Sequence, residues 1–249
     1  MLPVINSITG NVYLPVLKKN IRVKNYTLKE EKILLFNKEF AETNDIFFTI
    51  RELVKECTLD KIDVEKITIT DLTVIFIKIL ELSKGTEIIQ KFRCTNKNED
   101  GKECGCMIDV PINLSEYEII NLDKNDNNII KNKNVTIVFR YPSNKEFSEI
   151  ISSENKNEDI IKLFSLCIEE IYDNEKLFKR DVDYTDDELY EWILNNFSSD
   201  ELEQFSKYVY EMPKIRKLIT VKCPKCGYEE EIEVSSLEDF FIQDIQENQ

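Results

Sequence analysis

Two groups of cysteines that lie far apart in the chain constrain this sequence more than any other feature. Near the end of the chain, Cys223-Pro-Lys-Cys226-Gly227 has the form of a metal-binding knuckle. Two residues between the cysteines let both thiolates reach one ion, and the glycine permits a tight turn that points backbone amides at sulfur. One knuckle supplies two ligands, whereas a tetrahedral structural zinc needs four. The other two ligands must therefore come from another part of the chain.

The second group, Cys94, Cys104 and Cys106, lies more than a hundred residues earlier. In both groups an apolar strand leads into a cysteine, a Cys-Gly pair follows, and a short strand comes next. This degenerate repeat predicts a zinc ribbon in which Cys94, Cys104, Cys223 and Cys226 hold one structural zinc ion. Cys106 is the rival of Cys104, because spacing cannot resolve a Cys-Gly-Cys triplet.

The same cysteines allow other interpretations. All seven cysteines could be reduced, buried thiols. Thioredoxin-like redox chemistry needs the first cysteine at a helix N-terminus, whereas strands are predicted on both sides of Cys223. Catalytic zinc usually recruits histidine or carboxylate ligands and keeps an open position. Cys57 and Cys167 lie on apolar helix faces, so we expect them to be ordinary core residues.

The composition excludes several classes of function. None of the 249 residues is histidine, so Ser-His-Asp triads, Cys-His dyads and histidine metal ligands cannot exist. The formal net charge of −15 opposes nucleic-acid binding. No apolar run approaches the roughly 20 residues of a membrane helix. The start, Met1-Leu-Pro-Val-Ile-Asn6, lacks the features of a signal peptide, so we expect a reducing compartment and no membrane partner.

Hydrophobic periodicity predicts the elements of the first third of the chain. Residues 11 to 24 alternate as a hairpin. Helices are expected over 28–40, 46–57 and 70–83, and Gly85 ends the third. Apolar residues nearly encircle that third helix, which predicts that it is central and buried.

The remainder mixes strands and helices. Residues 121 to 134 are predicted to form a loop, and 135 to 139 a strand. Residues 145 to 212 are predicted to be helical, with an apolar stripe and an N-terminal capping box. The capping box is Thr185 with Glu188, and Ser199 starts a further helix. The stripe consists of Ile160, Leu163, Phe164, Cys167, Ile168 and Ile171. A strand is expected over 215–221. A last helix, capped by Ser235 and Glu238, would pack on its own ribbon or present Leu237, Phe240, Phe241 and Ile245 to a partner.

These elements predict an α+β fold, rich in helices, with small antiparallel hairpins forming a zinc-ribbon-like unit. We expect residues 1–85 to form an N-terminal hairpin with helices. Residues 86–120 and 214–249 would form the ribbon and terminal helix, and 121–213 an inserted, mostly helical segment.

An ordered set of segments also resembles a known family. The segments are Lys24-Asn-Tyr-Thr-Leu-Lys-Glu-Glu-Lys-Ile-Leu-Leu35, Cys57-Thr-Leu59, Ile62-Asp-Val-Glu-Lys66, Thr70-Asp-Leu72, Phe92-Arg-Cys94, Glu211-Met-Pro-Lys214, Cys223-Pro-Lys-Cys-Gly227 and Leu237-Glu-Asp-Phe-Phe241. They resemble the baseplate hub subunit family of T-even (T-four-type) contractile-tailed bacteriophages, the family of the hub protein encoded by gene twenty-six. The similarity covers nearly the whole chain, although the insert between Cys94 and Cys104 is longer than the turn expected in that family.

The resemblance implies a non-catalytic structural or assembly protein of the phage tail baseplate hub. Its partners would be other baseplate hub proteins. It would be located in the host cytoplasm during assembly, and the virion tail baseplate is a further candidate location. Paired cysteine knuckles in the family map onto Cys94 with Cys104 or Cys106, and onto Cys223 with Cys226. The alternatives are a zinc-ribbon protein associated with nucleic acid or transcription, and an enzyme that uses carboxylates or cysteine. The oligomeric state is left open.

Overall fold

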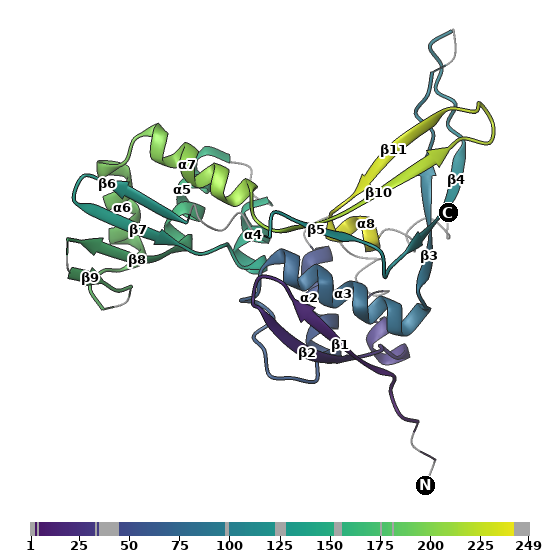
Figure 1. Cartoon of the computed structure of the whole chain (residues 1–249), viewed down its shortest axis with the longest axis horizontal. Helices are drawn as coiled ribbons and strands as arrows, with labels where there is room; N and C mark the ends of the chain where they lie inside the picture. Colours follow the sequence, from purple (N-terminus) through teal and green to yellow (C-terminus); the bar gives the residue numbers. More distant parts are fainter. Residues whose placement is uncertain are drawn as a thin grey trace. The chain divides into compact units, whose positions relative to one another are not determined.

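The structure is a computed structural model that describes residues 3, 5–32, 34, 45–97, 100–122, 128–151, 156–174, 176–180 and 182–241. Helices and small antiparallel sheets make it an α+β protein, which confirms the predicted fold class (Figure 1). The chain divides into two compact units. Unit 1 comprises Met1–Val64, Thr70–Ile120 and Lys214–Gln249, and unit 2 comprises Glu65–Ile69 and Asn121–Pro213. The division into three parts made from the sequence stays a prediction.

Unit 1 begins with a hairpin and continues with helices. Strand β1 (Thr9–Leu14) pairs antiparallel with β2 (Lys19–Lys24), as the alternation predicted. Of the helix predicted over 28–40, residues 28–32 and 34 are helical, and the rest lies outside the described residues. Helices α2 (Asp45–Cys57) and α3 (Ile69–Lys84) confirm the next two predictions. The inward side chains of the hairpin are Val12, Leu14, Ile21 and Val23.

Helix α3 is the centre of unit 1. It is buried on almost every side, as its nearly continuous apolar pattern predicted, through Leu72, Val74, Ile75, Phe76, Ile77, Ile79 and Leu80. Its first turn contains a buried carboxylate, Asp71, which accepts hydrogen bonds from the backbone N–H groups of Val16 at 3.0 Å and Leu17 at 2.9 Å. Those two donors lie between β1 and β2, so Asp71 holds the hairpin against the helix. Gly85, with φ of +98°, follows the helix.

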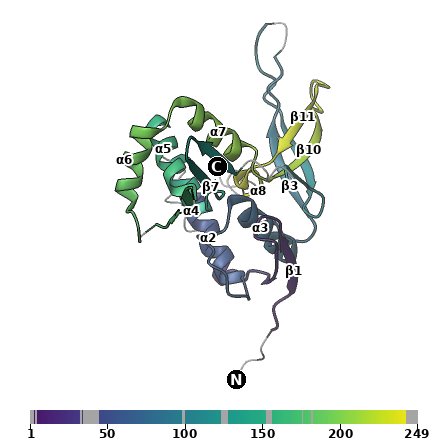
Figure 2. The ribbon, with the colours of Figure 1, turned by 60° about the vertical axis from the view of Figure 1, so that its left-hand side comes forward.

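Two hairpins complete unit 1. Strand β3 (Glu87–Arg93) pairs with β4 (Met107–Asn113), and β10 (Lys214–Lys222) pairs with β11 (Glu229–Val234). The short strand β5 (Glu118–Ile120) adds to β10, which gives the sheet order β11-β10-β5. The two hairpins lie side by side in both views, although more than a hundred residues separate them in sequence (Figures 1 and 2).

The last helix differs from the prediction in its cap. Helix α8 (Leu237–Phe241) begins after Ser236, whose Oγ accepts from the N–H of Asp239. The Asp239 carboxylate accepts in return from the N–H groups of Ser235 and Ser236, so Asp239 is the partner of Ser236 in the cap. Leu237 and Phe240 are both buried. Ile245 lies outside the described residues.

Unit 2 consists of a four-stranded antiparallel sheet and helices. The sheet order is β6-β7-β8-β9, from β6 (Ile129–Asn132), β7 (Val135–Phe139), β8 (Ile168–Asp173) and β9 (Lys176–Phe178). The helices are α4 (Asn144–Ile151), α5 (Lys156–Cys167), α6 (Asp186–Asn196) and α7 (Ser199–Tyr210). Strand and helix side chains share one core, which includes Ile130, Ile137, Phe139, Leu163, Phe164, Cys167, Ile168, Ile171, Leu189, Ile193, Phe205 and Tyr208.

Two predictions in unit 2 were wrong. Residues 129–132 form a strand within the predicted loop, and residues 168–173 and 176–178 form strands within the predicted helical segment. The second error has a physical reason. Phe139 pairs with Ile168 whereas Val138 pairs with Glu170, so β8 contains an extra residue, a β-bulge. The bulge places Ile168 and Ile171 in the same core, and a spacing of three imitates a helical stripe.

The capping signal of α6 and the start of α7 at Ser199 confirm the predictions. Thr185 and Glu188 form the predicted capping box at α6. Ser198, one residue before the predicted start, caps α7 with Glu201. No helix within the described ranges is long and apolar enough to cross a membrane.

We expect Asp71→Asn to lower the free energy of unfolding by about 1–3 kcal/mol, because a carboxamide oxygen cannot replace both acceptors of the buried carboxylate. Urea denaturation followed by circular dichroism would measure the loss. Asp109→Asn is the matched control: Asp109 is exposed on β4, and its effect should stay within about 0.5 kcal/mol. Equal effects of both substitutions would contradict the role of Asp71.

Candidate metal centre

Four cysteine sulfurs meet between the two hairpins of unit 1. The Sγ atoms of Cys94, Cys104, Cys223 and Cys226 all lie within 4.8 Å of one another. Cys94 Sγ is 3.7 Å from Cys226 Sγ, and Cys104 Sγ is 3.8 Å from Cys223 Sγ. A tetrahedral zinc with sulfur ligands at 2.3 Å would separate neighbouring sulfurs by about 3.8 Å. The two closest pairs therefore already have the spacing that a tetrahedral tetrathiolate site requires.

The backbone explains why these four side chains converge. Cys94 directly follows β3, and Cys223 directly follows β10, so each hairpin delivers one cysteine at the end of its first strand. Cys104 and Cys226 lie on the loops that return toward β4 and β11. Because the hairpins lie side by side, their loops face one another.

The two loops repeat the same hydrogen bonds. In the second, the N–H of Gly227 donates to Cys223 O at 2.9 Å, and the N–H of Cys223 donates to Tyr228 O at 2.8 Å. In the first, Gly105 N–H donates to Cys94 O at 3.0 Å, and Cys94 N–H donates to Cys106 O at 2.9 Å. Both glycines have positive φ, +63° and +74°. The degenerate repeat seen in the sequence is thus also a repeat of backbone structure.

This correspondence distinguishes Cys104 from Cys106 as the residue equivalent to Cys226. Cys104 matches Cys226 as the residue before the glycine, whereas Cys106 matches Tyr228 as the residue after it. The Sγ of Cys106 points to Met107 O at 3.5 Å and does not join the four-sulfur cluster. The longer first loop is closed at its base, since Cys104 N–H donates to Asn96 O at 2.7 Å. The extra residues therefore extend the loop without displacing Cys104.

Backbone N–H groups that point at the sulfurs influence the pKa values of the four thiols. The N–H of Cys226 points at the Cys223 sulfur and lowers the pKa of that thiol to about 6. The N–H of Tyr228 lowers the pKa of Cys226. The N–H of Asn96 acts in the same direction on Cys94, but burial and hydrogen bonds with the other thiols outweigh it and raise the pKa of Cys94 to about 12. The cluster thus favours a thiolate at Cys223, and a metal would displace protons from the others.

Apolar side chains surround the cluster. Cys94 and Cys223 are buried in one small core with Ile108, Val110 and Val221, while Cys226 is exposed. Such a setting suits a structural metal, which needs four protein ligands and no access for substrate. In the described parts of the chain, no other group of cysteines and carboxylates brings its donor atoms together in this way.

The remaining predicted core cysteines lie where they were expected. Cys57 and Cys167 are both buried, and burial raises the pKa of each to about 12. They are therefore poor nucleophiles, and neither is a member of the four-sulfur cluster. Strand β10 immediately precedes Cys223, so this cysteine is not at the helix N-terminus that thioredoxin-like chemistry requires.

Two residues that contact the cluster were not predicted from the sequence. The side-chain amide of Asn96 donates to Cys226 Sγ at 3.6 Å, and Lys225 Nζ donates to Cys104 O at 3.4 Å. Both link one knuckle to the other. The only signal in the sequence is their position close to a cysteine, which does not show that they reach across to the opposite loop.

Comparison with known protein families gives a match over nearly the whole chain. A family model described as T4 bacteriophage base plate protein matches residues 6–242. No curated protein and no solved structure shows detectable similarity to the chain.

We expect the purified chain to bind one Co²⁺ ion, a spectroscopic substitute for Zn²⁺, with the intense absorption of a tetrahedral cobalt thiolate. Cys104→Ser should abolish that absorption because it removes one of four converging ligands. Cys106→Ser is the matched control and should retain it. Retention by Cys104→Ser with loss by Cys106→Ser would reverse the assignment, and zinc below about a tenth of an equivalent in the purified protein would contradict the site.

Proposed function

The chain belongs to the T4 bacteriophage base plate protein family, and from this membership we propose that it is a non-catalytic subunit of the baseplate hub, stabilised by a structural zinc. It is a phage baseplate structural protein; its place in the hub and its zinc are the parts that we propose. It would act by binding other tail proteins, first in the host cytoplasm during assembly and then in the tail baseplate.

The convergence of four sulfurs is the observation that supports the zinc. Zinc at this position would connect the β3–β4 loop to the β10–β11 loop, and so join two segments separated by more than a hundred residues. Closing a long loop removes much conformational freedom from the unfolded chain. A two-stranded hairpin is at best marginally stable alone, so both hairpins gain from being joined.

The chemistry of the cluster supports a role without catalysis. A zinc ion bound by four thiolates has no open position for water or substrate. The chain contains no histidine that could serve as a general base or a proton shuttle. We therefore propose that the metal centre stabilises the fold and that function resides in surfaces that bind other proteins.

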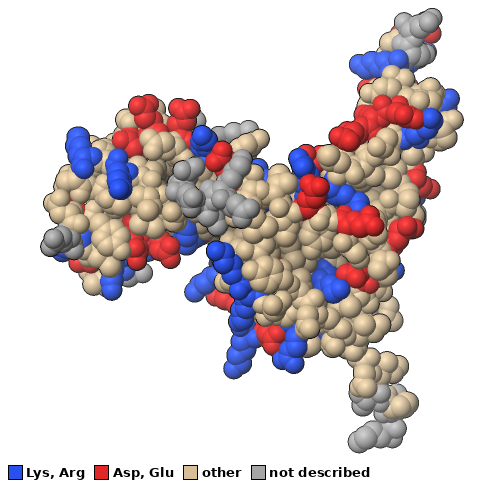
Figure 3. All heavy atoms as spheres, viewed as in Figure 1, with Lys and Arg blue, Asp and Glu red and all other residues tan. Residues whose placement is uncertain are grey.

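The charge of unit 1 supports partners that are proteins with basic surfaces. Acidic side chains gather over β11, an edge strand of its sheet, as Figure 3 shows. They come from Glu229, Glu230, Glu231 and Glu233. Charges on an edge strand oppose unspecific pairing with other strands, and a negative surface selects positive partners. The same charges, with a net charge of −15, argue against the alternative of a nucleic-acid-binding zinc ribbon.

We expect metal removal to destabilise the protein. A ligand present at 1,000 times its dissociation constant contributes about 4 kcal/mol, which corresponds to roughly 8–16 °C in melting temperature for a chain of this size. Thermal unfolding with and without a chelator would measure this shift. Acidification should act in the same direction, because protons compete with metal for thiolates. Cys106→Ser should respond to chelator as the wild type does, whereas a wild type indifferent to chelator would contradict the structural zinc.

We expect the tagged chain to co-purify with other tail proteins from infected cells during assembly. Deletion of its gene should abolish tail assembly, and electron microscopy of lysates would show the defect. Complementation with Cys106→Ser should restore tails, and Cys104→Ser should restore fewer. Normal tails after the deletion would contradict the proposed function.

A further inference from the structure

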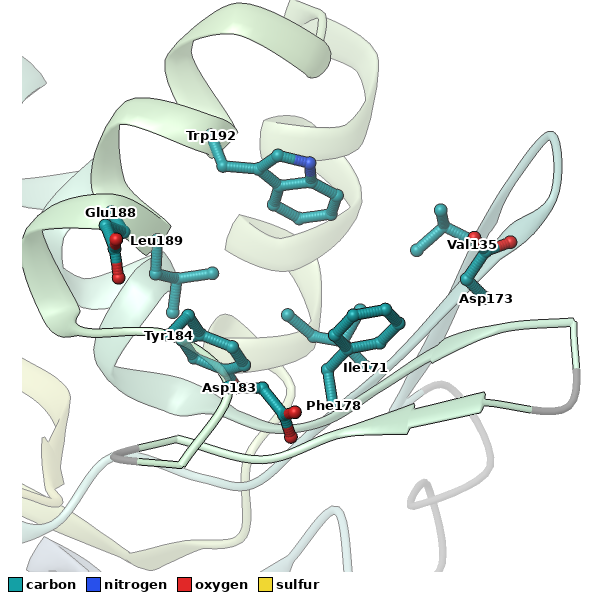
Figure 4. Close-up of a pocket in the computed structure, with 9 residues that line it drawn as sticks. All are labelled: Val135, Ile171, Asp173, Phe178, Asp183, Tyr184, Glu188, Leu189 and Trp192. Atoms are coloured by element: carbon teal, nitrogen blue, oxygen red, sulfur yellow. The ribbon is translucent and has the colours of Figure 1, made fainter.

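Unit 2 contains a pocket that the metal centre and the fold do not require. Its volume is about 360 Å³, within the range of sites that hold small molecules. The walls come from the strands β7, β8 and β9 on one side and from α6 with the preceding residues on the other (Figure 4). The floor is apolar, because Ile171 and Leu189 are buried core residues.

Three aromatic rings line this pocket. Phe178, Tyr184 and Trp192 are each half-buried, so part of every ring contacts the core and part faces the pocket. Trp192 is fixed in place by an edge-to-face contact with Phe197, with ring centroids 5.2 Å apart. Aromatic faces attract cations. The ring of Phe178 already does so within this chain, since Lys176 Nζ lies 4.2 Å from its centroid.

Three carboxylates accompany the rings. Figure 4 shows Glu188 and Asp173 at opposite sides of the pocket, with Phe178 and Trp192 between them, and Asp183 beside Phe178. No lysine or arginine is among the residues that line the pocket, which all belong to the described part of the chain. The lining of the pocket therefore combines aromatic faces with an excess of negative charge, and Lys176, whose Nζ lies over the ring of Phe178, is a cation of this chain beside it.

Hydrogen bonds hold each carboxylate in position through one oxygen. Asp173 Oδ1 accepts from Asn134 Nδ2 at 2.6 Å, and Asp183 Oδ2 accepts from the N–H of Lys179 at 2.9 Å. Glu188 Oε2 accepts from Thr185 as part of the capping box. Capping also lowers the pKa of Glu188, because the backbone N–H of Thr185 stabilises its charge. The second oxygen of each carboxylate takes no part in these bonds and can accept from a ligand.

From this geometry we propose that the pocket binds a lysine or arginine side chain of a partner protein. The alkyl stem would cover the apolar floor and the aromatic rings, while the cationic head would stay at the rim among the carboxylates. An anionic ligand would be repelled by the three acids. A purely apolar ligand would gain nothing from them. The inference rests on the proposed function only in naming a protein as the source of the side chain.

The chain offers a selective reporter for this test, because Trp192 is its single tryptophan. We expect N-acetyl-lysine methylamide and N-acetyl-arginine methylamide to change Trp192 fluorescence in a saturable manner, and more weakly at high salt. The neutral analogues N-acetyl-norleucine methylamide and N-acetyl-citrulline methylamide should bind about fivefold more weakly or worse. Equal binding of charged and neutral probes, or no response to any probe, would overturn the proposal.

Variants locate the binding in the pocket. Asp183→Asn and Phe178→Leu should each weaken binding of the lysine probe by about fivefold. Asp187→Asn is the matched control for charge, because Asp187 is an exposed residue in the first turn of α6 that does not line the pocket. It should bind the probe as the wild type does. An equal loss in Asp187→Asn and Asp183→Asn would show an effect of net charge alone and overturn the proposal.

Co-purification from infected cells tests the source of the side chain. Asp183→Asn should recover less of at least one tail protein than Asp187→Asn does. Equal recovery by both variants would overturn the assignment to a partner protein and leave the baseplate function intact. If the wild-type chain recovered no tail protein while the lysine probe still bound at Trp192, the proposed function would fail separately from the pocket's affinity for basic side chains.

Discussion

The four-sulfur junction is the contact on which the arrangement of the two later hairpins of unit 1 depends. It brings Cys94 and Cys104, on the loop between β3 and β4, against Cys223 and Cys226, between β10 and β11. Small hairpins bury little apolar surface, and the core shared by these two contains few residues. Matching backbone bonds in the two loops, with left-handed glycines at equivalent positions, aim all four sulfurs at one point. A metal at that point would stabilise both hairpins together.

Unit 2 is stabilised in a different way. Its core contains a cluster of aromatic rings. The ring centroid of Phe164 lies 5.0 Å from that of Phe139 and 4.8 Å from that of Phe205. Such rings bury large apolar areas, so this unit has a core that needs no metal. The same helices and strands that form this core also place carboxylates and aromatic rings around the pocket of Trp192. The chain thus combines a candidate metal-stabilised unit with a unit that carries a candidate binding pocket.

Local signals in the sequence located most elements. The hairpin alternation, the nearly continuous apolar pattern of α3 and the capping box of Thr185 gave elements that the structure confirms. The errors came from tertiary effects. The β-bulge in β8 forms where that strand pairs with β7. In the sequence, the spacing of three between its buried residues imitates a helix. Spacing alone could not show which of the neighbouring serines and acidic residues form the cap of α8.

The sequence by itself determined the chemistry that this protein can use. It contains no histidine, an excess of acidic residues and two groups of cysteines that resemble metal-binding knuckles. The degenerate repeat predicted that the two cysteine groups meet, and only the tertiary structure decided between Cys104 and Cys106, because the Sγ of Cys104 joins the cluster whereas that of Cys106 does not. It also decided that acids and aromatic residues from β8, β9 and α6 surround one pocket. The segments around the pocket share no repeated motif, so their contacts depend on how those segments pack, and no local pattern of residues specifies them.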